Sequence, residues 1–209
     1  DAYAINDQVS GISGISAEQN PAAQIVKAGN INLEDIAVVG TTASFPEVRD
    51  YFLAEGRYFS EDENDRGIKI AVLGAGLARD LFGEESALGQ QVSVGSIKFT
   101  VVGVMEEKGI VADVDYDGRV YLPINVVLDK YMTQSRLVGD RVRTIYVKAD
   151  SAENVDRVIT QITSLLAERH EVDESSPDFT VQTQQDIIAT QEATTEAFRD
   201  LLGWVAGVS

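Results

Sequence analysis

Two glycines that follow a short β-rich run are the first residues of this chain whose spacing suggests chemistry. Gly74 and Gly76 come directly after Ile70–Leu73 and stand at the start of a helical pattern. A dinucleotide-binding fingerprint begins in this way, but its third glycine would stand where this chain has Arg79. The sequence therefore favours a tight strand-to-helix turn that needs small residues. The alternative is a nucleotide-dependent enzyme that uses Gly74 and Gly76.

An aspartate repeat is the second candidate site. Asp113, Asp115 and Asp117 alternate along the chain and are followed by Gly118, which matches the first half of a calcium-binding loop. The twelfth position of such a loop requires a bidentate glutamate, and this chain has Ile124 there. We therefore expect a solvated turn at this repeat, without a bound metal.

Few side chains are available for nucleophilic catalysis. The chain has no cysteine, which excludes disulfides, thiolate metal sites and a cysteine nucleophile, and its one histidine is His170. His170 ends a predicted helix without a serine–aspartate pattern around it, so a capping or solvent-exposed role is expected. The phosphate-binding motif G-x-x-x-x-G-K-[ST] does not occur. We expect no catalytic residue, no cofactor-binding residue and no metal ligand.

The charge of the chain bears on its partners. Its 209 residues include 34 acidic and 17 basic side chains, which gives a formal net charge of -17. This balance argues against nucleic acid and anionic lipid headgroups, because both require a basic surface. We expect the local cluster Arg136, Arg141 and Arg143 to be a solvated, charge-balancing loop. The hydrophobic content of 44% indicates a globular protein with a core.

No apolar run reaches the roughly 20 residues that a membrane-spanning helix needs. No signal peptide opens the chain either. The sequence becomes apolar over Leu201–Val208, where it stops, and this stretch includes Trp204, a residue type that suits a membrane interface. We expect a soluble piece of a longer protein. An ordinary C-terminal helix docked on the core is the alternative.

The two glycines belong to a compact unit from Ile68 to Met105. This unit reads as a strand, a helix that ends at Gly83, and a hairpin with its turn at Gly95-Ser96. Because a hairpin comes next, we expect no parallel strand after the helix. The charged stretch before the unit, Glu61–Arg66, is expected to be a solvated loop.

The later part of the chain predicts helices and strands in alternation. A strand is expected over Thr144–Ala149, and a helix capped by Ser151 has an apolar stripe over Val155–Leu166. A strand over Phe179–Thr183 would complete a β-α-β unit. The last predicted helix is Gln184–Val205. The predicted fold class is therefore α+β.

A series of short motifs follows a fixed order along most of the chain. They are Val38-Val39-Gly40-Thr41, Gly56-Arg57-Tyr58-Phe59-Ser60, Ala71-Val72-Leu73-Gly74, Leu81-Phe82-Gly83, Gly89-Gln90-Gln91-Val92, Phe99-Thr100-Val101-Val102-Gly103-Val104 and Tyr121-Leu122-Pro123. In this order and spacing the chain resembles the extracytoplasmic domain of MacB-type ABC transporter permeases. That family includes macrolide and peptide exporters and lipoprotein-releasing permeases. The resemblance extends from about Val38 to Phe198.

The resemblance implies a division into domains. Residues 1–50 and 140–186 would form a porter-like β-α-β subdomain, and residues 51–139 would form a small α/β subdomain inserted into it. Residues 187–209 would form a stalk helix that leads toward a membrane span. The stalk would carry motions of the ATPase to the domain.

The resemblance also implies a function, namely an extracytoplasmic, non-catalytic domain that couples ATP-driven conformational change to export of a substrate. Expected partners are a second copy of the permease and an ABC ATPase on a separate domain or subunit. An adaptor, or an exported peptide, lipoprotein or drug, is a further expected partner. The alternatives are the nucleotide-dependent enzyme and a free secreted binding module. Apolar runs of about 20 residues on both sides of the chain would favour the permease.

Overall fold

The computed structural model describes residues 1–111, 114–132, 142–173 and 175–186. Residue contacts divide the chain into two compact units, Asp1–Asn154 and Val155–Ser209. Within the first unit the described helices are α1 (Ala2–Gln8), α2 (Phe45–Arg49), α3 (Glu61–Asp65), α4 (Ala75–Phe82), α5 (Ile124–Lys130) and the short 3-10 helix η2 (Ala152–Asn154). None of the described helices is long and apolar enough to cross a membrane.

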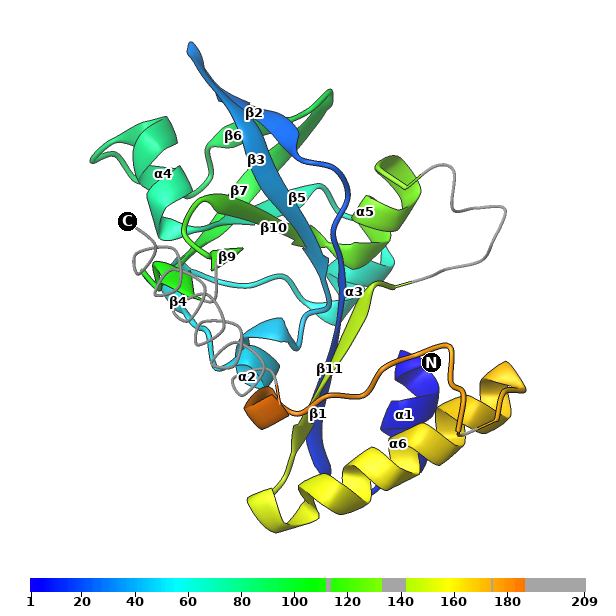
Figure 1. Ribbon diagram of the computed structural model, residues 1–209. Helices are drawn as coiled ribbons and strands as arrows, with labels where there is room; N and C mark the ends of the chain where they lie inside the picture. The colour runs from blue at the N-terminus through cyan, green and yellow to red at the C-terminus, as the bar shows by residue number, and fades with distance from the viewer. Residues whose placement is uncertain (112–113, 133–141, 174, 187–209) are drawn as a thin grey trace, which may run out of the picture. The chain divides into compact units, whose positions relative to one another are not determined.

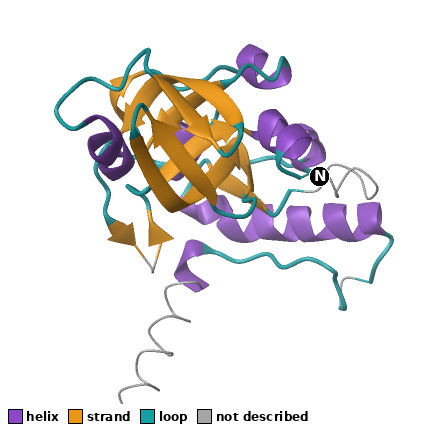
Figure 2. Cartoon of the chain, turned by 90° about the horizontal axis from the view of Figure 1, so that it is seen from above, coloured by secondary structure: helices purple, strands orange, loops and turns teal. Residues whose placement is uncertain are grey.

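Six described strands of the first unit pair into a closed ring. Figure 1 labels them in one part of the molecule. Their order around the ring is β10 (Arg119–Pro123), β5 (Ile70–Leu73), β7 (Ile97–Met105), β6 (Gln91–Val94), β2 (Gln24–Ala28) and β3 (Ile31–Thr41). The ring closes because β10 also pairs in parallel with β3, with Val120 opposite Val38. A closed ring leaves these strands without the open edges of a flat sheet, so the fold is a small β-barrel. In Figure 2, where strands are orange, most strands of the protein lie together in one group.

The core consists of two buried clusters, one on each face of β3, β5 and β10. Val38, Leu73 and Leu122 belong to the cluster that all six barrel strands share, together with residues of α4 and α5. Their chain neighbours Val39, Val72 and Tyr121 belong to the second cluster, with Phe45 of α2. Burial on both faces explains why these strands have nearly continuous apolar sequences instead of an alternating pattern.

The remaining described strands extend this barrel or stand beside it. They are β1 (Ile12–Gln19), β4 (Leu53–Gly56), β8 (Ile110–Val111), β9 (Val114–Asp115) and β11 (Thr144–Ala149). β1 and β11 form an antiparallel ribbon that joins the barrel where Glu18 of β1 lies opposite Thr41 of β3. β4 pairs with β7, and β8 and β9 form a separate hairpin. The predicted α+β class is confirmed.

The prediction that no parallel strand follows α4 is wrong. β5 and β7 pair in parallel, with Ile70 opposite Thr100 and Leu73 opposite Val104. The hairpin of β6 and β7 itself was predicted correctly, with its turn at Gly95 and Ser96. Because a hairpin reverses the chain once, its second strand can run in the same direction as the strand before the helix.

The prediction of a solvated loop over Glu61–Arg66 is also wrong, because α3 forms there. Ser60 caps this helix by accepting a hydrogen bond from the Glu63 backbone N–H, and the Glu63 carboxylate accepts one from the Ser60 N–H. This reciprocal capping box satisfies two backbone donors that a short helix would otherwise leave unpaired. Arg57 also donates two hydrogen bonds to the Glu63 carboxylate, each of 2.7 Å.

The described part of the second unit contains α6 (Val155–His170), and Val158, Ile162 and Leu166 on its apolar stripe are buried. The strand predicted over Phe179–Thr183 is wrong, because these residues form no described strand. Its alternating sequence is a local signal, whereas a strand also requires a hydrogen-bonded neighbour. Nearly all of the predicted helix Gln184–Val205 lies outside the described residues.

Candidate functional site

The turn at Gly74 is explained by its contact with the chain before β10. The Gly74 N–H donates to the Arg119 carbonyl at 2.9 Å, and the Leu77 N–H donates to the Asp117 carbonyl at 2.8 Å. A Cβ at Gly74 would lie 2.4 Å from the Asp117 oxygen, whereas a Cβ at Gly76 would lie 3.2 Å from the Asp117 Cβ. The protein's own carbonyl group therefore occupies the start of α4, where a dinucleotide fingerprint would bind pyrophosphate. The interpretation as a tight turn is confirmed.

The described carboxylates of the aspartate repeat are engaged by backbone N–H groups. Asp115 Oδ1 accepts from the N–H groups of Asp117 and Gly118, each at 3.0 Å. The two oxygens of Asp117 accept from the N–H groups of Lys108 and Gly109, each at 2.9 Å. These bonds hold the base of the β8–β9 hairpin. Asp113 lies outside the described residues, and among the described ones no group of three possible ligands is placed to hold a metal.

His170 lies at the end of α6 and contacts residues a short distance along the chain. Its Nδ1 is 2.7 Å from Asp178 Oδ1, and its ring meets the Phe179 ring edge-on with 5.7 Å between centroids. This pairing fits the expected role at a helix end. Arg136 and Arg141 lie outside the described residues, whereas the Arg143 N–H donates to the Glu18 carbonyl at 3.1 Å.

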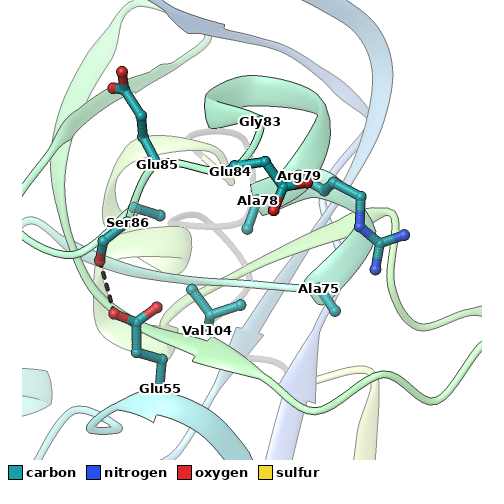
Figure 3. A pocket seen from close by; sticks show the side chains of 10 residues that line it. Glu55, Ala75, Ala78, Arg79, Gly83, Glu84, Glu85, Ser86 and Val104 are labelled. Carbon is teal, nitrogen blue, oxygen red and sulfur yellow. Dashed lines mark hydrogen bonds between the residues drawn. The ribbon is translucent and has the colours of Figure 1, made fainter.

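A shallow depression beside α4 is one candidate site, and no motif in the sequence predicted it (Figure 3). Its volume is about 440 Å³. The lining residues are Glu55, Ala75, Ala78, Arg79, Gly83, Glu84, Glu85, Ser86, Ala87 and Val104. Ser86 Oγ donates to the Glu55 carboxylate at 2.7 Å, and Ala87 and Val104 are buried at its base. Arg79 extends away from this pair in Figure 3 and lies 3.6 Å from Glu107.

The depression is lined by polar and charged side chains as well as by small apolar ones. Ser86 donates to a carboxylate and has no histidine base, since the only histidine of the chain is His170 and it contacts Asp178. Glu55, Glu84 and Glu85 give the rim negative charge. Arg79 is the one cation among the lining residues, so the rim is more acidic than basic.

A partly buried charge pair joins the β1–β11 ribbon to α2, and the sequence did not predict it. Glu18 is 7% exposed, and Arg49 Nε lies 3.9 Å from its Oε1. Burial raises the pKa of the Glu18 carboxyl group above its ordinary value, while the charges of Arg49 and Arg119 oppose that rise. The Arg49 guanidinium also lies 3.9 Å from the centroid of the Tyr146 ring. These residues come from distant parts of the chain and share no spacing that a motif could reveal.

Comparisons with known proteins agree on one family. A family model described as "MacB-like periplasmic core domain" matches residues 1–165. The macrolide export ATP-binding/permease protein MacB of Bdellovibrio bacteriovorus is 32% identical over 213 residues, which cover 100% of this chain and 31% of the relative. The pyoverdine export ATP-binding/permease protein PvdT of Pseudomonas aeruginosa is 28% identical over 91% of this chain and 28% of its own length. The chain thus spans about a third of the length of these curated relatives or less.

A solved structure supports the fold. The periplasmic region of MacB from Actinobacillus actinomycetemcomitans matches with a TM-score of 0.72 and 23% identity, over 91% of this chain and 81% of that chain. At this level of identity the likeness bears on the fold alone.

Proposed function

The chain belongs to the family of MacB-like periplasmic core domains, and on this premise we propose that it is the extracytoplasmic domain of an ABC exporter permease. In this role it couples ATP-driven conformational change to export of a substrate. The match to the family over residues 1–165 is the observation that carries the proposal. The names of both curated relatives, which combine export with ATP binding and a permease, support it.

The domain itself is proposed to be non-catalytic. The phosphate-binding motif is absent from its sequence, and the start of α4 is occupied by the carbonyl of Asp117. ATP hydrolysis is therefore assigned to a separate ATPase domain or subunit. The domain would act mechanically, by opening and closing on a substrate or an adaptor as a second copy of the permease moves with it.

The division into a porter-like part (1–50 and 140–186), an inserted part (51–139) and a stalk (187–209) remains a proposal. Strands from the first two parts pair directly, since β3 pairs with β10 and β2 pairs with β6. Residues 1–50 and 51–139 therefore contribute strands to one sheet and would move together. The stalk lies outside the described residues and is proposed as the lever.

The proposal is tested by measuring which side of the membrane the domain faces. Ser96 is exposed in the β6–β7 turn, and the chain has no cysteine, so a Ser96→Cys substitution provides a single reactive thiol in this domain. In spheroplasts that express the full-length protein without other cysteines, a membrane-impermeant maleimide should label this thiol from outside. A control thiol in a cytoplasmic protein should be labelled only after lysis. Labelling of Ser96→Cys only after lysis would reject the extracytoplasmic assignment.

A further inference from the structure

Three cationic side chains of the first unit gather around one tyrosine. Arg49 Nη2 donates to the Tyr116 hydroxyl at 3.1 Å. Lys108 Nζ and Arg119 Cζ each lie 4.8 Å from the centroid of the Tyr116 ring. The cations come from α2, from the segment after β7 and from the start of β10. We call Arg49, Lys108, Arg119 and Tyr116 the Tyr116 cluster.

Some hydrogen-bond donors of the Tyr116 cluster have no acceptor among the described residues. Arg49 Nε is buried and has no hydrogen-bond acceptor there. Lys108 Nζ lies 4.6 Å from the Tyr51 ring centroid and 4.8 Å from that of Tyr116, but it forms no hydrogen bond or ion pair with a described residue. Arg119 uses its Nε to donate to the Asp115 carbonyl at 2.7 Å. Donors of charged groups that are left without acceptors are costly when they are partly buried.

Two of the nearby carboxylates are engaged by other groups. Asp117 accepts from two backbone N–H groups, and Asp50 lies 2.6 Å from Lys148 Nζ. Glu18 comes no closer than 3.9 Å to Arg49. The cluster therefore brings three cationic side chains together in a chain that has 34 acidic and 17 basic side chains, with the charges of Asp50 and Glu106 acting on Lys108 as well.

The electrostatics of Lys108 agree with this geometry. Burial, and after it the charge of Arg49, lowers the pKa of Lys108 below its ordinary value, and Asp50 and Glu106 only oppose this effect. Positive charges that repel each other in a partly buried place would be stabilised by a bound anion.

We propose that the Tyr116 cluster binds an oxyanion group, a carboxylate or a phosphate, of a small-molecule ligand. Lys108 and Arg119 would donate charge-assisted hydrogen bonds to its oxygens, and the Tyr51 and Tyr116 rings would flank it. The competing explanation is that the cations only pack on the rings and stabilise the fold through cation–π contacts. The proposal does not rest on the export function, so either can fail alone.

Calorimetric titration of the 209-residue chain tests the proposal, with citrate as the carboxylate probe and pyrophosphate as the phosphate probe at low ionic strength. We expect saturable binding of at least one probe, and the preferred probe identifies the oxyanion. Lys108→Gln and Arg119→Gln should each weaken binding about tenfold, because each removes a charged hydrogen bond. Lys98→Gln is the matched control, since Lys98 is an exposed lysine on β7, and it should change the affinity less than about twofold.

Thermal unfolding of each variant separates binding from folding. A variant that keeps the melting temperature of the wild type but binds the probe more weakly supports the site. The proposal is overturned if neither probe binds at millimolar concentration, or if Lys98→Gln weakens binding as much as the cluster variants do. It is equally overturned if Lys108→Gln and Arg119→Gln lower the melting temperature but leave the affinity for the probe unchanged, because the cluster is then structural.

Discussion

Gly74 illustrates how a backbone contact, and not a ligand, can require a glycine. The Asp117 carbonyl occupies the space where a side chain at position 74 would begin. The sequence indicated a tight turn here because Arg79 breaks the dinucleotide fingerprint. It could not indicate the Glu18–Arg49 pair or the Tyr116 cluster, since their members come from separate elements. Local motifs predict turns, whereas sites assembled from distant elements require the fold.

Gly74→Ala should destabilise the protein by about 2 kcal/mol, the middle of the range for overpacking a tight site. The added Cβ would lie 2.4 Å from the Asp117 oxygen, and backbone cannot easily move away. Gly76→Ala is the control, because its Cβ meets Asp117 at 3.2 Å and alanine favours the helix. Urea unfolding should show the larger loss for Gly74→Ala. Equal losses would contradict the packing explanation.

The capping box of α3 should make stability depend on pH through Glu63. Hydrogen bonds from Arg57 are the main reason that the pKa of Glu63 falls from 4.5 to about 2. A carboxyl group with a lowered pKa stabilises the fold above its unfolded pKa, and this stabilisation is lost as the pH falls toward its folded pKa. Glu63→Gln should therefore cost about 0.5 kcal/mol near neutral pH, a value typical of exposed ion pairs.

The difference between the wild type and Glu63→Gln should shrink as the pH falls from 4.5 toward 2, the interval between the two pKa values. Urea unfolding at a series of pH values measures it. Asp62→Asn is the control, because Asp62 pairs with Arg66 on the exposed side of the same helix. A difference that stays constant over this interval would show that the Glu63 charge does not stabilise α3.

At the scale of elements, the sequence predicted most of the regular structure but missed interactions between side chain and backbone. The strand of β5, the helix α4 and the hairpin of β6 and β7 have clear periodicity and turn residues. The helix α3 is short and charged, so it lacks an apolar stripe and reads as a loop. The spacing of Ser60 and Glu63 matches a capping box and was the available signal for its start.

The aspartate repeat should hold the β8–β9 hairpin without calcium. Asp115 and Asp117 already accept four hydrogen bonds from backbone N–H groups, so these oxygens are oriented by the protein itself. A chelator should leave the melting temperature unchanged, because no stabilising ion is removed. A fall in the melting temperature that added calcium reverses would disprove this prediction.

At the scale of the whole molecule, the closed barrel could not be read from local patterns. β3 and β10 lie far apart in the chain, and their parallel pairing closes the ring of six strands. Their apolar runs indicated buried strands, but not which strands would be neighbours. The order of short motifs was more informative, since it predicted the family that the match over residues 1–165 shows.

The isolated chain should be mainly monomeric. Its net charge of -17 makes two copies repel each other on average. Sedimentation at physiological salt should show one species with the mass of a single chain. A tight dimer at micromolar concentration would mean that this domain itself drives assembly and that local contacts overcome the repulsion.

Movement of the domain during the ATP cycle tests the central claim most directly. A spin label at Ser96→Cys in the full-length permease without other cysteines, reconstituted in liposomes, reports the distance between two copies. The account predicts that this distance distribution changes between the nucleotide-free state and a state trapped after ATP binding, and that a variant unable to bind ATP shows no change. An identical distribution in both states of the active protein would contradict the claim that this domain transmits ATP-driven motion.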